Sequence, residues 1–433
     1  MRIKNLLCLL LVLSVQNFAQ SFWQKIESPT SKKLNAVVFI DSLRGWAAGD
    51  SGLIIHTSDG GDSWSTQYSN DSLAIVNINI INERIGYASA TSGLYEPYGS
   101  YLLRTTNGGV NWTAEYMRIG EFFVNSITFL DSLEGFAVGY PGFFLRTSDG
   151  GSSWRQVQLD SSIFAGYSPY TVKFLNRNYG FACGGARDVT GVIWRTSDSG
   201  FSWDTVVDTS SAPPEPLFAI NIFDSLNVLV MGGDPEFGAS AMKSTDGGKF
   251  WDYTTLGILY FPVEVGFRTH TEGWAPMGPK LEFLYTDDSG ESWSEIPTPD
   301  STYVTNISFP DSIHGFAVGV NGTMIRYHYQ KPNSVKSFPD NHASFSLAQN
   351  YPNPFNPSTR INYRISRDGL VRLVVYDILG REVTTLVNEY RQAGEYTAEF
   401  NVSSSENILP SGIYFYRLQS SEHSMVKKMI LLR

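Results

Sequence analysis

Acidic and aromatic side chains gather in the irregular segments of the sequence, where ligand binding or catalysis is most often found. Two carboxylates that face each other across a cleft would provide the acid and the base or nucleophile of a glycoside hydrolase. Aromatic rings beside them would instead offer a surface on which a ligand can pack. The candidate side chains are Tyr95, Glu96, Tyr98, Asp188, Asp234, Glu236 and Phe237, with Glu282 as a further carboxylate and Phe164 and Tyr167 as further aromatic residues.

Other catalytic and metal-binding patterns are missing from the sequence. The six histidines are scattered, without the spacing of a zinc-binding pair or of a mixed Cys/His set. The sequence also has no Gly-x-Ser-x-Gly elbow and no glycine-rich phosphate loop. We therefore expect no catalytic residue, no cofactor and no metal, and we expect the candidate side chains to form a ligand-binding face.

A repeated motif determines which elements position these segments. Six segments share the pattern Thr/Ser-x-Asp/Asn-Gly/Ser-Gly-x-x-Trp, and successive tryptophans lie 42 to 49 residues apart. This period is typical of one blade of a β-propeller. The acidic or amide position and the tryptophan of each copy are Asp59 and Trp64, Asn107 and Trp112, Asp149 and Trp154, Asp198 and Trp203, Asp246 and Trp251, and Asp288 and Trp293.

Each repeat contains a second recurring element, Gly-aromatic-Ala, which predicts the second strand of a blade. It occurs at Gly45, Gly86, Gly135, Gly180, Gly273 and Gly315, with a degraded copy at residues 227–231. These seven second strands exceed the six motifs by one. The last unit ends near Tyr327 without a motif. Phe22 and Trp23 precede the first unit, and Trp23 stands at the position that a motif tryptophan takes ahead of the other units. The pattern therefore predicts seven blades, the last completed by the N-terminal strand, which would leave no exposed sheet edge.

The motif is interpreted as a structural turn between the third and fourth strands. A carboxylate such as Asp59 can accept hydrogen bonds from backbone N–H groups in the turn, and glycine tolerates a positive φ. The tryptophan would pack over the turn at the interface between blades. Asn107 can replace the carboxylate in this role, and Ser199 and Ser289 stand where other copies have their first glycine.

The six motifs resemble the Asp-box (BNR) repeat, and residues 22–330 are similar to photosystem II stability and assembly factors. That resemblance implies a single propeller. In the group, arginines form a binding patch, and here basic side chains recur before the motif at His56, Arg104, Arg146, Arg195, Lys243 and Arg326, with Tyr285 interrupting the series. We interpret them as solvated strand positions whose stems cover apolar surface, with a binding patch as the alternative. Asp-boxes also occur in sialidases and endoglucanases, but the Phe/Tyr-Arg-Ile-Pro motif of sialidases is missing.

The N-terminus has the pattern of a cleavable signal peptide over residues 1–20. Arg2 and Lys4 precede an apolar run from Leu6 to Val15, and Ala19 offers a cleavage point. The run is too short to cross a bilayer, and no later segment is apolar enough to do so. Cys183 is the only cysteine beyond this segment, so the exported chain is expected to fold without an internal disulfide.

The composition changes after a polar, proline-containing linker at residues 331–344. Residues 345–433 contain short alternating segments at 359–365, 371–376, 396–400 and 412–418, which favour a small β-sandwich. The region resembles the C-terminal sorting domain of type IX secretion cargo, through Tyr-Pro-Asn-Pro-Phe-Asn-Pro at 351–357, Tyr-Asp-Ile-Leu-Gly-Arg-Glu-Val at 376–383 and Leu-Pro-Ser-Gly-Ile-Tyr at 409–414. The resemblance implies that outer-membrane secretion machinery is a partner.

These observations predict an all-β protein: a seven-bladed β-propeller over residues 21–330, closed by its N-terminal strand, and an immunoglobulin-like sandwich over residues 345–433. A formal net charge of −10 opposes binding to nucleic acid. We expect a secreted or cell-surface protein, delivered through the periplasm and outer membrane of a Gram-negative bacterium, whose propeller binds an extracellular protein or glycan. The alternative is a secreted glycoside hydrolase of sialidase-like or endoglucanase-like type.

Overall fold

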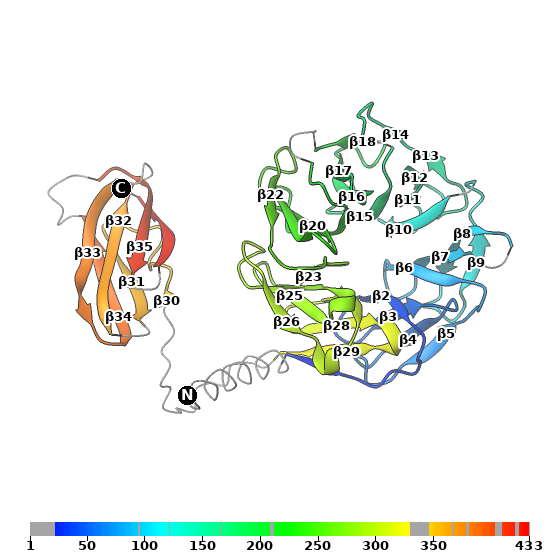
Figure 1. Cartoon of the computed structure of the whole chain (residues 1–433), viewed down its shortest axis with the longest axis horizontal. Helices are drawn as coiled ribbons and strands as arrows, with labels where there is room; N and C mark the ends of the chain where they lie inside the picture. The colour runs from blue at the N-terminus through cyan, green and yellow to red at the C-terminus, as the bar shows by residue number, and fades with distance from the viewer. Residues whose placement is uncertain are drawn as a thin grey trace. The chain divides into compact units, whose positions relative to one another are not determined.

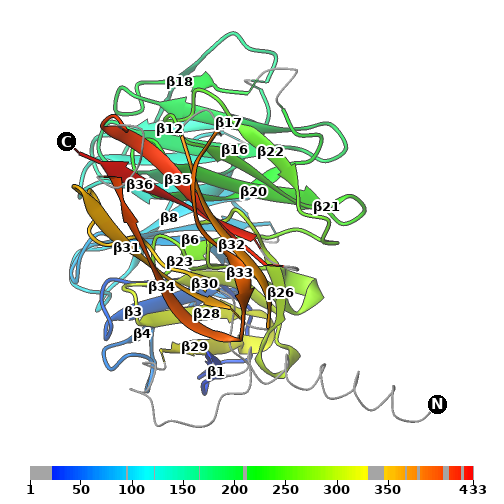
Figure 2. The ribbon, with the colours of Figure 1, turned by 90° about the vertical axis from the view of Figure 1, so that its left-hand side faces the viewer.

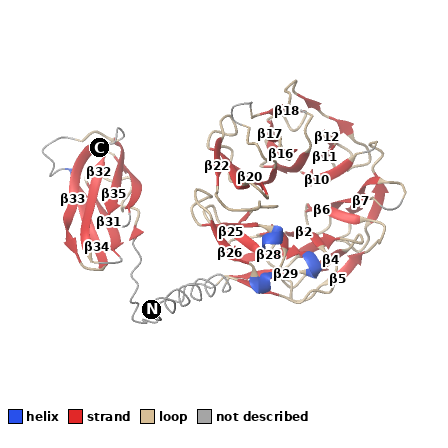
Figure 3. Ribbon diagram, in the orientation of Figure 1, coloured by secondary structure: helices blue, strands red, loops and turns tan. Residues whose placement is uncertain are grey.

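The structure is a computed structural model that describes residues 22–93, 96–120, 122–164, 166–207, 212–329, 346–365, 368–377, 381–402, 409–420 and 424–432. The chain divides into two compact units, Met1–Gln330 (unit 1) and Lys331–Arg433 (unit 2). Both are built from β-strands, and the only helical elements of the described residues are η1 (Gly278–Lys280), η2 (Pro299–Ser301) and η3 (Val320–Gly322) (Figure 3). The predicted signal peptide and linker lie outside these residues.

The described part of unit 1 contains seven sheets, which we number in chain order. Sheet 1 is β2 (Leu34–Phe39), β3 (Gly45–Gly49), β4 (Ile54–Thr57) and β5 (Ser65–Tyr68). Sheet 2 is β6 (Ala74–Ile80), β7 (Gly86–Ser92), β8 (Gly99–Thr105) and β9 (Thr113–Tyr116). Sheet 3 is β10 (Phe123–Phe129), β11 (Gly135–Tyr140), β12 (Phe143–Thr147) and β13 (Arg155–Gln156).

Sheet 4 has a fifth strand, β14 (Gln158–Leu159), which runs parallel to the outer strand β18. Its other strands are β15 (Pro169–Phe174), β16 (Gly180–Ala186), β17 (Thr190–Thr196) and β18 (Ser202–Thr205). Sheet 5 is β19 (Leu217–Ile222), β20 (Val228–Asp234), β21 (Gly238–Ser244) and β22 (Asp252–Thr255). Sheet 6 is β23 (Gly266–Phe267), β24 (Gly273–Pro276), β25 (Glu282–Thr286) and β26 (Ser294–Pro297).

Sheet 7 combines the two ends of unit 1. Its strands are β27 (Val304–Ser308), β28 (His314–Gly319), β29 (Met324–His328) and the N-terminal β1 (Trp23–Lys25). Strand β1 pairs antiparallel with β29, and Trp23 stands opposite Tyr327. The Trp23 side chain is fully buried and packs on Trp274 and Phe283 of sheet 6. The N-terminal strand therefore joins the last sheet to its predecessor.

The strand order gives unit 1 two sides that carry different kinds of turn. Successive strands of a sheet are antiparallel, so the turns after the first and third strands lie on one side, which we call the box face. The hairpins between second and third strands and the connections between sheets lie on the other side, the loop face. Figure 1 shows the sheets arranged around a common centre, with β2, β6, β10 and β15 toward the inside. None of the described sheets closes on itself.

Stacked aromatic rings hold neighbouring sheets together. Phe39 of sheet 1 stacks on Phe316 of sheet 7, with ring centroids 3.5 Å apart. Tyr87 of sheet 2 stacks in the same way on Phe129 of sheet 3, at 3.6 Å. The aromatic residue of the Gly-aromatic-Ala element thus packs on the first strand of the following sheet, and offset or parallel rings at these distances add to the energy of burial.

Unit 2, drawn in orange to red in Figure 2, contains two sheets. The two sheets share one hydrophobic core. Ile361 and Phe400 of one sheet and Val375, Tyr416 and Leu431 of the other belong to the same buried cluster. The first sheet is β30 (Ser346–Leu347), β31 (Ser358–Ile365) and β34 (Gly394–Asn401). The second, in spatial order, is β33 (Glu382–Arg391), β32 (Gly369–Tyr376), β35 (Gly412–Gln419) and β36 (Ser424–Leu431).

The sequence patterns of unit 2 predicted four of these strands and missed β30, β33 and β36. In β33, only Val387 is buried, and polar residues occupy both sides of the strand. The strand therefore lacks the alternation of apolar and polar residues that marks a half-buried strand. Its backbone pairing with β32 places it in the sheet all the same.

Candidate functional site

The six repeated motifs form turns with the same hydrogen bonds. In the first, Thr57 Oγ1 accepts a hydrogen bond from the backbone N–H of Gly61 at 2.9 Å and donates to Asp59 Oδ1 at 2.7 Å. The Asp59 carboxylate also accepts from the N–H and the hydroxyl of Ser63. These bonds hold the pKa of Asp59 well below its usual range, with the Ser63 hydroxyl as the largest cause. The carboxylate is thus bound within its own turn.

The remaining copies repeat this arrangement with small changes. Asn107 accepts from the N–H of Asn111 through Oδ1, so an amide oxygen performs the same task. Asp149 binds Ser153, whose hydroxyl is the largest of the effects that lower the pKa of Asp149 to about 2. Asp198, Asp246 and Asp288 each accept a backbone N–H within their own turns, and the pKa of each is lowered.

The second glycine of each motif lies against the preceding sheet. Gly200, in the turn of sheet 4, has a φ of +70°, and a Cβ added there would lie 2.1 Å from Phe136 of sheet 3. Glycine is therefore required both by the backbone conformation and by the space. The motif tryptophans lie nearby: Trp112, Trp203 and Trp251 are buried, whereas Trp64, Trp154 and Trp293 are half-buried.

The basic residues before the motif contact the turn of the following sheet. Arg195 of sheet 4 donates to the carbonyl oxygen of Gly247 in sheet 5 at 3.1 Å. Lys243 of sheet 5 pairs with Glu291 in the turn of sheet 6. Arg326 of sheet 7 donates to the carbonyl oxygen of Gly60 in sheet 1. The series is interrupted at Tyr285 in sheet 6, and sheet 7, which follows, has no such turn because its outer strand is β1.

These contacts correct the interpretation of the basic residues as solvated strand positions. Arg146 lies with its guanidinium carbon 3.9 Å from the ring centroid of Phe201 in the next turn and pairs with Glu134. His56 of sheet 1 packs on Trp46 instead, and Gln67 of the same sheet donates to the carbonyl oxygen of Gly108. Most members of the series thus connect one sheet to the next, a role that the sequence alone did not reveal.

The predicted ligand-binding residues lie on the loop face in two groups. Glu96 and Tyr98 belong to the β7–β8 hairpin of sheet 2, where Tyr98 is 53% exposed. Asp188 lies in the β16–β17 hairpin of sheet 4, and Asp234, Glu236 and Phe237 lie in the β20–β21 hairpin of sheet 5, where Phe237 is 73% exposed. Tyr95 lies outside the described residues. The hairpins of sheets 4 and 5 are neighbours, whereas sheet 3 separates them from that of sheet 2.

Two expectations about this face are corrected. Phe164, expected as an exposed aromatic residue, is only 8% exposed and packs in the core of sheets 4 and 5, while Tyr167 is half-buried beside it. Asp234 is only 4% exposed, and its Oδ2 lies 3.1 Å from Nε of Arg187 in the neighbouring hairpin. Its carboxylate therefore connects two hairpins, while Asp188 and Glu236 remain exposed.

A central cavity of about 440 Å³, which the sequence did not predict, is lined by the first strands of sheets 1, 2, 3, 4 and 7 and by the residues just before β23. Its polar lining includes Asn35 of sheet 1, Asn77 and Asn79 of sheet 2, Asn125 of sheet 3, Lys173 of sheet 4 and Asn306 of sheet 7. Lys173 Nζ lies 2.9 Å from Oε1 of Glu264, which precedes β23. The asparagines occupy strand positions that alternate with buried apolar residues, and this alternation was the only sequence signal for the lining.

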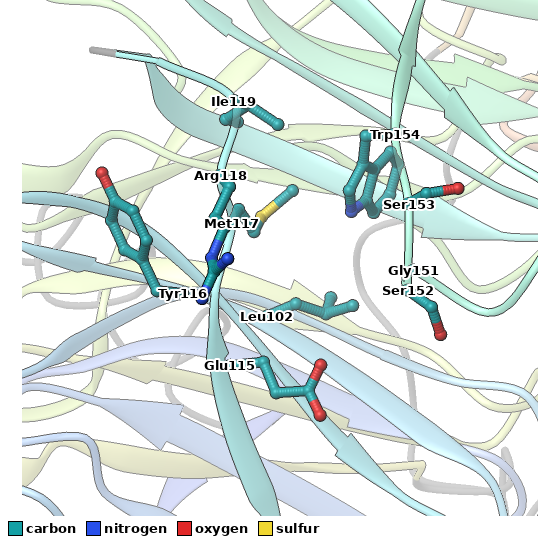
Figure 4. Close-up of a pocket in the computed structure, with 10 residues that line it drawn as sticks. All are labelled: Leu102, Glu115, Tyr116, Met117, Arg118, Ile119, Gly151, Ser152, Ser153 and Trp154. Carbon is teal, nitrogen blue, oxygen red and sulfur yellow. The ribbon is translucent and has the colours of Figure 1, made fainter.

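A second cavity, of about 590 Å³, lies between sheets 2 and 3. Figure 4 shows Glu115 and Arg118, from the end of β9, on one side and Ser152, Ser153 and Trp154, from the motif turn of sheet 3, on the other.

Among the described residues, no group of three or more His, Cys, Asp or Glu side chains is placed to hold a metal ion. Nor does any helix of these residues have the length and apolarity to span a membrane.

This architecture, sheets arranged around a centre and followed by a separate β-domain, defines an all-β, propeller-like protein. Residues 73–260 match the family described as Photosynthesis system II assembly factor YCF48, and residues 349–432 match the Secretion system C-terminal sorting domain. The chain therefore contains a YCF48-like BNR region at residues 73–260 of unit 1 and a type IX sorting domain in unit 2, and both resemblances noted in the sequence are confirmed. The sorting domain implies a secreted or outer-membrane-associated protein.

Solved structures support the fold. The chain is 18% identical to YCF48 bound to a D1 peptide, with a TM-score of 0.57 over 72% of this chain and 98% of that one. It is 20% identical to YCF48 from Cyanidioschyzon merolae, with a TM-score of 0.55 over 71% and 99%. A GH74 xyloglucanase from Xanthomonas campestris is 13% identical, with a TM-score of 0.57 over 79% of this chain and 59% of that one. No curated protein matches the chain significantly.

Proposed function

We propose that the chain is a cargo of type IX secretion whose propeller acts outside the cell as a non-catalytic binding module. In this proposal, residues 1–20 direct export and are removed, residues 21–330 form the binding module, and residues 331–344 link it to the sorting domain at 345–433. The match of residues 349–432 to a sorting domain supports delivery through the outer-membrane machinery.

The proposal includes a closed ring of seven blades and an immunoglobulin-like sandwich. The pairing of Trp23 with Tyr327 supports closure, because it places the first strand of unit 1 in the last sheet. The hydrogen bond from Arg326 to Gly60 supports it further, because it connects that sheet to the first one. In unit 2, two sheets around one core support a sandwich.

The observation that carries the binding proposal is the exposure of large apolar side chains on the loop face. Tyr98 and Phe237 extend into solvent from hairpins on different sheets. Tyr140 and Val189 are also exposed in hairpins of this face. Hairpins on a rigid scaffold are a common place for recognition, and these side chains are the apolar surface that the hairpins present. A related propeller, YCF48, has been solved with a bound peptide.

A glycoside hydrolase is the alternative, and the xyloglucanase with a similar fold is the reason to consider it. The carboxylates available on the loop face argue against it. Asp234 is buried against Arg187, and Glu282 pairs with Lys280 at 3.2 Å. Carboxylates paired within the protein are poorly placed to act on a substrate, whereas a hydrolase needs two that face one across a cleft.

A capture experiment with a matched control tests the proposal. The mature chain would be immobilised, incubated with surface material of the native host, and compared with a Tyr98→Ala/Phe237→Ala variant and with Phe250→Ala. Phe250 is a suitable control because it is equally exposed but lies on the box face. We expect the double variant to lose the captured partner and Phe250→Ala to keep it. Capture that is indifferent to the double variant, or hydrolysis of the captured material, would contradict the proposal.

A further inference from the structure

The asparagines of the central cavity each use one end of the amide group to bind the next sheet. Asn306 Oδ1 accepts the backbone N–H of Val37 in sheet 1 at 3.0 Å. Asn79 Oδ1 accepts the N–H of Phe129 in sheet 3 at 2.9 Å. Asn125 works in the opposite sense, because its Nδ2 donates to the carbonyl oxygen of Pro169 in sheet 4 at 2.9 Å.

These bonds fix which amide atom remains available. An oxygen that accepts a backbone N–H leaves the NH₂ group, so Asn79 and Asn306 have an Nδ2 donor without a partner among the described residues. An NH₂ group that donates to a carbonyl leaves the oxygen, so Asn125 and Asn35, which donates to Ile75 at 2.8 Å, retain an Oδ1 acceptor. All four residues are half-buried and line the cavity. The lining therefore offers donors and acceptors whose orientation is set before any ligand arrives.

Among the described residues that line the cavity, the one cation, Lys173, and the one carboxylate, Glu264, form an ion pair, so together they add no net charge. Lys173 Nζ lies 2.9 Å from Glu264 Oε1 and also donates to the carbonyl oxygen of Ile220 in sheet 5 at 2.9 Å. The cation and the carboxylate thus neutralise each other within the wall. A phosphate or a carboxylate ligand would find no unpaired cation here, and an apolar side chain would leave the amide groups unsatisfied.

Three aromatic rings lie beside this lining. Tyr170, which lines the cavity, stacks on Phe218 with ring centroids 5.2 Å apart, and Phe218 stacks on Phe261 at 4.8 Å. The rings come from the beginnings of the first strands of sheets 4 and 5 and from the connection to sheet 6, so they lie at the loop-face end of the cavity. All three are half-buried and present part of their surface to solvent.

We propose that the central cavity binds a neutral carbohydrate, most simply the end of an oligosaccharide chain. This inference rests on the proposed function and names its ligand class. A sugar hydroxyl both donates and accepts, so it suits a lining with fixed donors and fixed acceptors and with a balanced charge. The C–H faces of a sugar ring pack well on aromatic side chains, and the volume is within the range of ligand sites. A chain end is favoured over a chain interior because strands of five sheets surround a volume of only about 440 Å³, which holds a small part of a long chain.

Substitutions that keep an acceptor for the bond between sheets but replace the free NH₂ group by a charged oxygen test the proposal. Asn79→Asp and Asn306→Asp retain an oxygen for Phe129 and Val37, but each replaces the free NH₂ donor by an acceptor. The matched control is Asn107→Asp, the same chemical change in a motif turn whose other copies have aspartate. The mature full-length variants would be applied to an array of short neutral oligosaccharides and polysaccharides, and the best ligand would be titrated by calorimetry.

We expect the parent and Asn107→Asp to bind the same oligosaccharide, and each cavity variant to bind it at least about tenfold more weakly at an unchanged melting temperature. The inference is overturned if no neutral carbohydrate binds, if only peptides or anionic glycans bind, or if the cavity variants bind as the parent does. Binding to polysaccharide interiors but not to short chains would overturn the chain-end assignment. Capture that still depends on Tyr98 and Phe237 would leave the proposed function standing without the carbohydrate site.

Discussion

Arg326 donates a hydrogen bond from Nη1 to the carbonyl oxygen of Gly60 at 3.0 Å, although 266 residues separate them in the sequence. The same nitrogen lies 2.6 Å from Asp62 Oδ1. One side chain of sheet 7 therefore contacts the motif turn of sheet 1 at two points. Arg195 makes the corresponding contact between sheets 4 and 5, so the contact at the ends of unit 1 follows the same rule as one in its middle.

Replacing Arg326 by alanine should lower the free energy of unfolding by about 1–2 kcal/mol, because a charged donor and its packing are lost at a partly exposed site. The measurement is denaturant unfolding of the mature chain. Arg155→Ala is the control, since Arg155 is an exposed arginine on β13. Equal effects of the two substitutions would show that the Arg326 contact contributes nothing of its own.

Deleting residues 21–32 should abolish cooperative unfolding of unit 1, because β29 would lose its partner and Trp23 would leave a hole beside Trp274 and Phe283. The milder Trp23→Ala should cost about 3–5 kcal/mol. Gln24→Ala is the control in the same strand, where Gln24 is exposed. A deletion variant with the melting temperature of the parent would exclude closure by the N-terminal strand.

Asp149→Ala should destabilise the fold by about 1 kcal/mol, since it removes an acceptor from an exposed turn. Asp149→Asn should cost less than Asp149→Ala at pH 7, because Asn107 performs the same task with an amide oxygen. Trp154→Ala should cost about 3 kcal/mol, near the lower limit for a large aromatic residue, because Trp154 is half-buried. Loss of ligand binding by Asp149→Ala at an unchanged melting temperature would contradict a purely structural role.

The same carboxylate should make stability depend on acid pH. Because folding lowers the pKa of Asp149 to about 2, its ionised form stabilises the fold above the unfolded pKa of ~4, and this contribution disappears as the pH falls through the folded pKa. The parent should therefore lose stability relative to Asp149→Asn as the pH is lowered from ~4 toward 2. Chemical unfolding at several pH values measures this difference, and parallel curves would refute it.

Export should depend on unit 2. A chain ending at residue 340 should accumulate in the periplasm of the native host, because the sorting domain matched at residues 349–432 is then missing. A passive reporter fused to residues 345–433 and preceded by a signal peptide should reach the surface or the medium. Cell fractionation follows both proteins. Surface delivery of the truncated chain would show that export does not require the sorting domain.

The sequence predicted the fold best where the same residues recur at a regular spacing in each repeat. The spacing of the motif tryptophans predicted the succession of sheets, and the register of Trp23 predicted a strand that pairs across almost the whole unit. The contacts that define the candidate site were hidden because their partners come from different repeats. Asn306 meets Val37 across 269 residues, and Lys173 meets Glu264 across 91. Nothing in the local sequence of either partner indicates the other.

Exposure on the loop face was predicted less well for a related reason. Phe164 and Phe237 both lie in connecting segments, yet Phe164 is buried among residues of sheets 4 and 5 while Phe237 extends into solvent. Asp188 and Asp234 also both lie in hairpins of this face, but only Asp234 is buried, and it forms an ion pair with Arg187 of the neighbouring hairpin. Whether a loop side chain is exposed depends on which residues of the neighbouring sheet pack against it or pair with it.

The antiparallel pairing of β1 with β29 has a mechanical consequence. The backbone N–H of His328, at the end of β29, donates to the carbonyl oxygen of Phe22, just before β1, so the two ends of unit 1 leave the sheet at the same point. A pulling force between the N-terminus and the connection to unit 2 would load the pairs Trp23–Tyr327, Gln24–Arg326 and Lys25–Ile325 one after another. Unit 1 would thus open like a zipper at low force, whereas a pull on two loops in the middle of the unit would have to shear whole sheets.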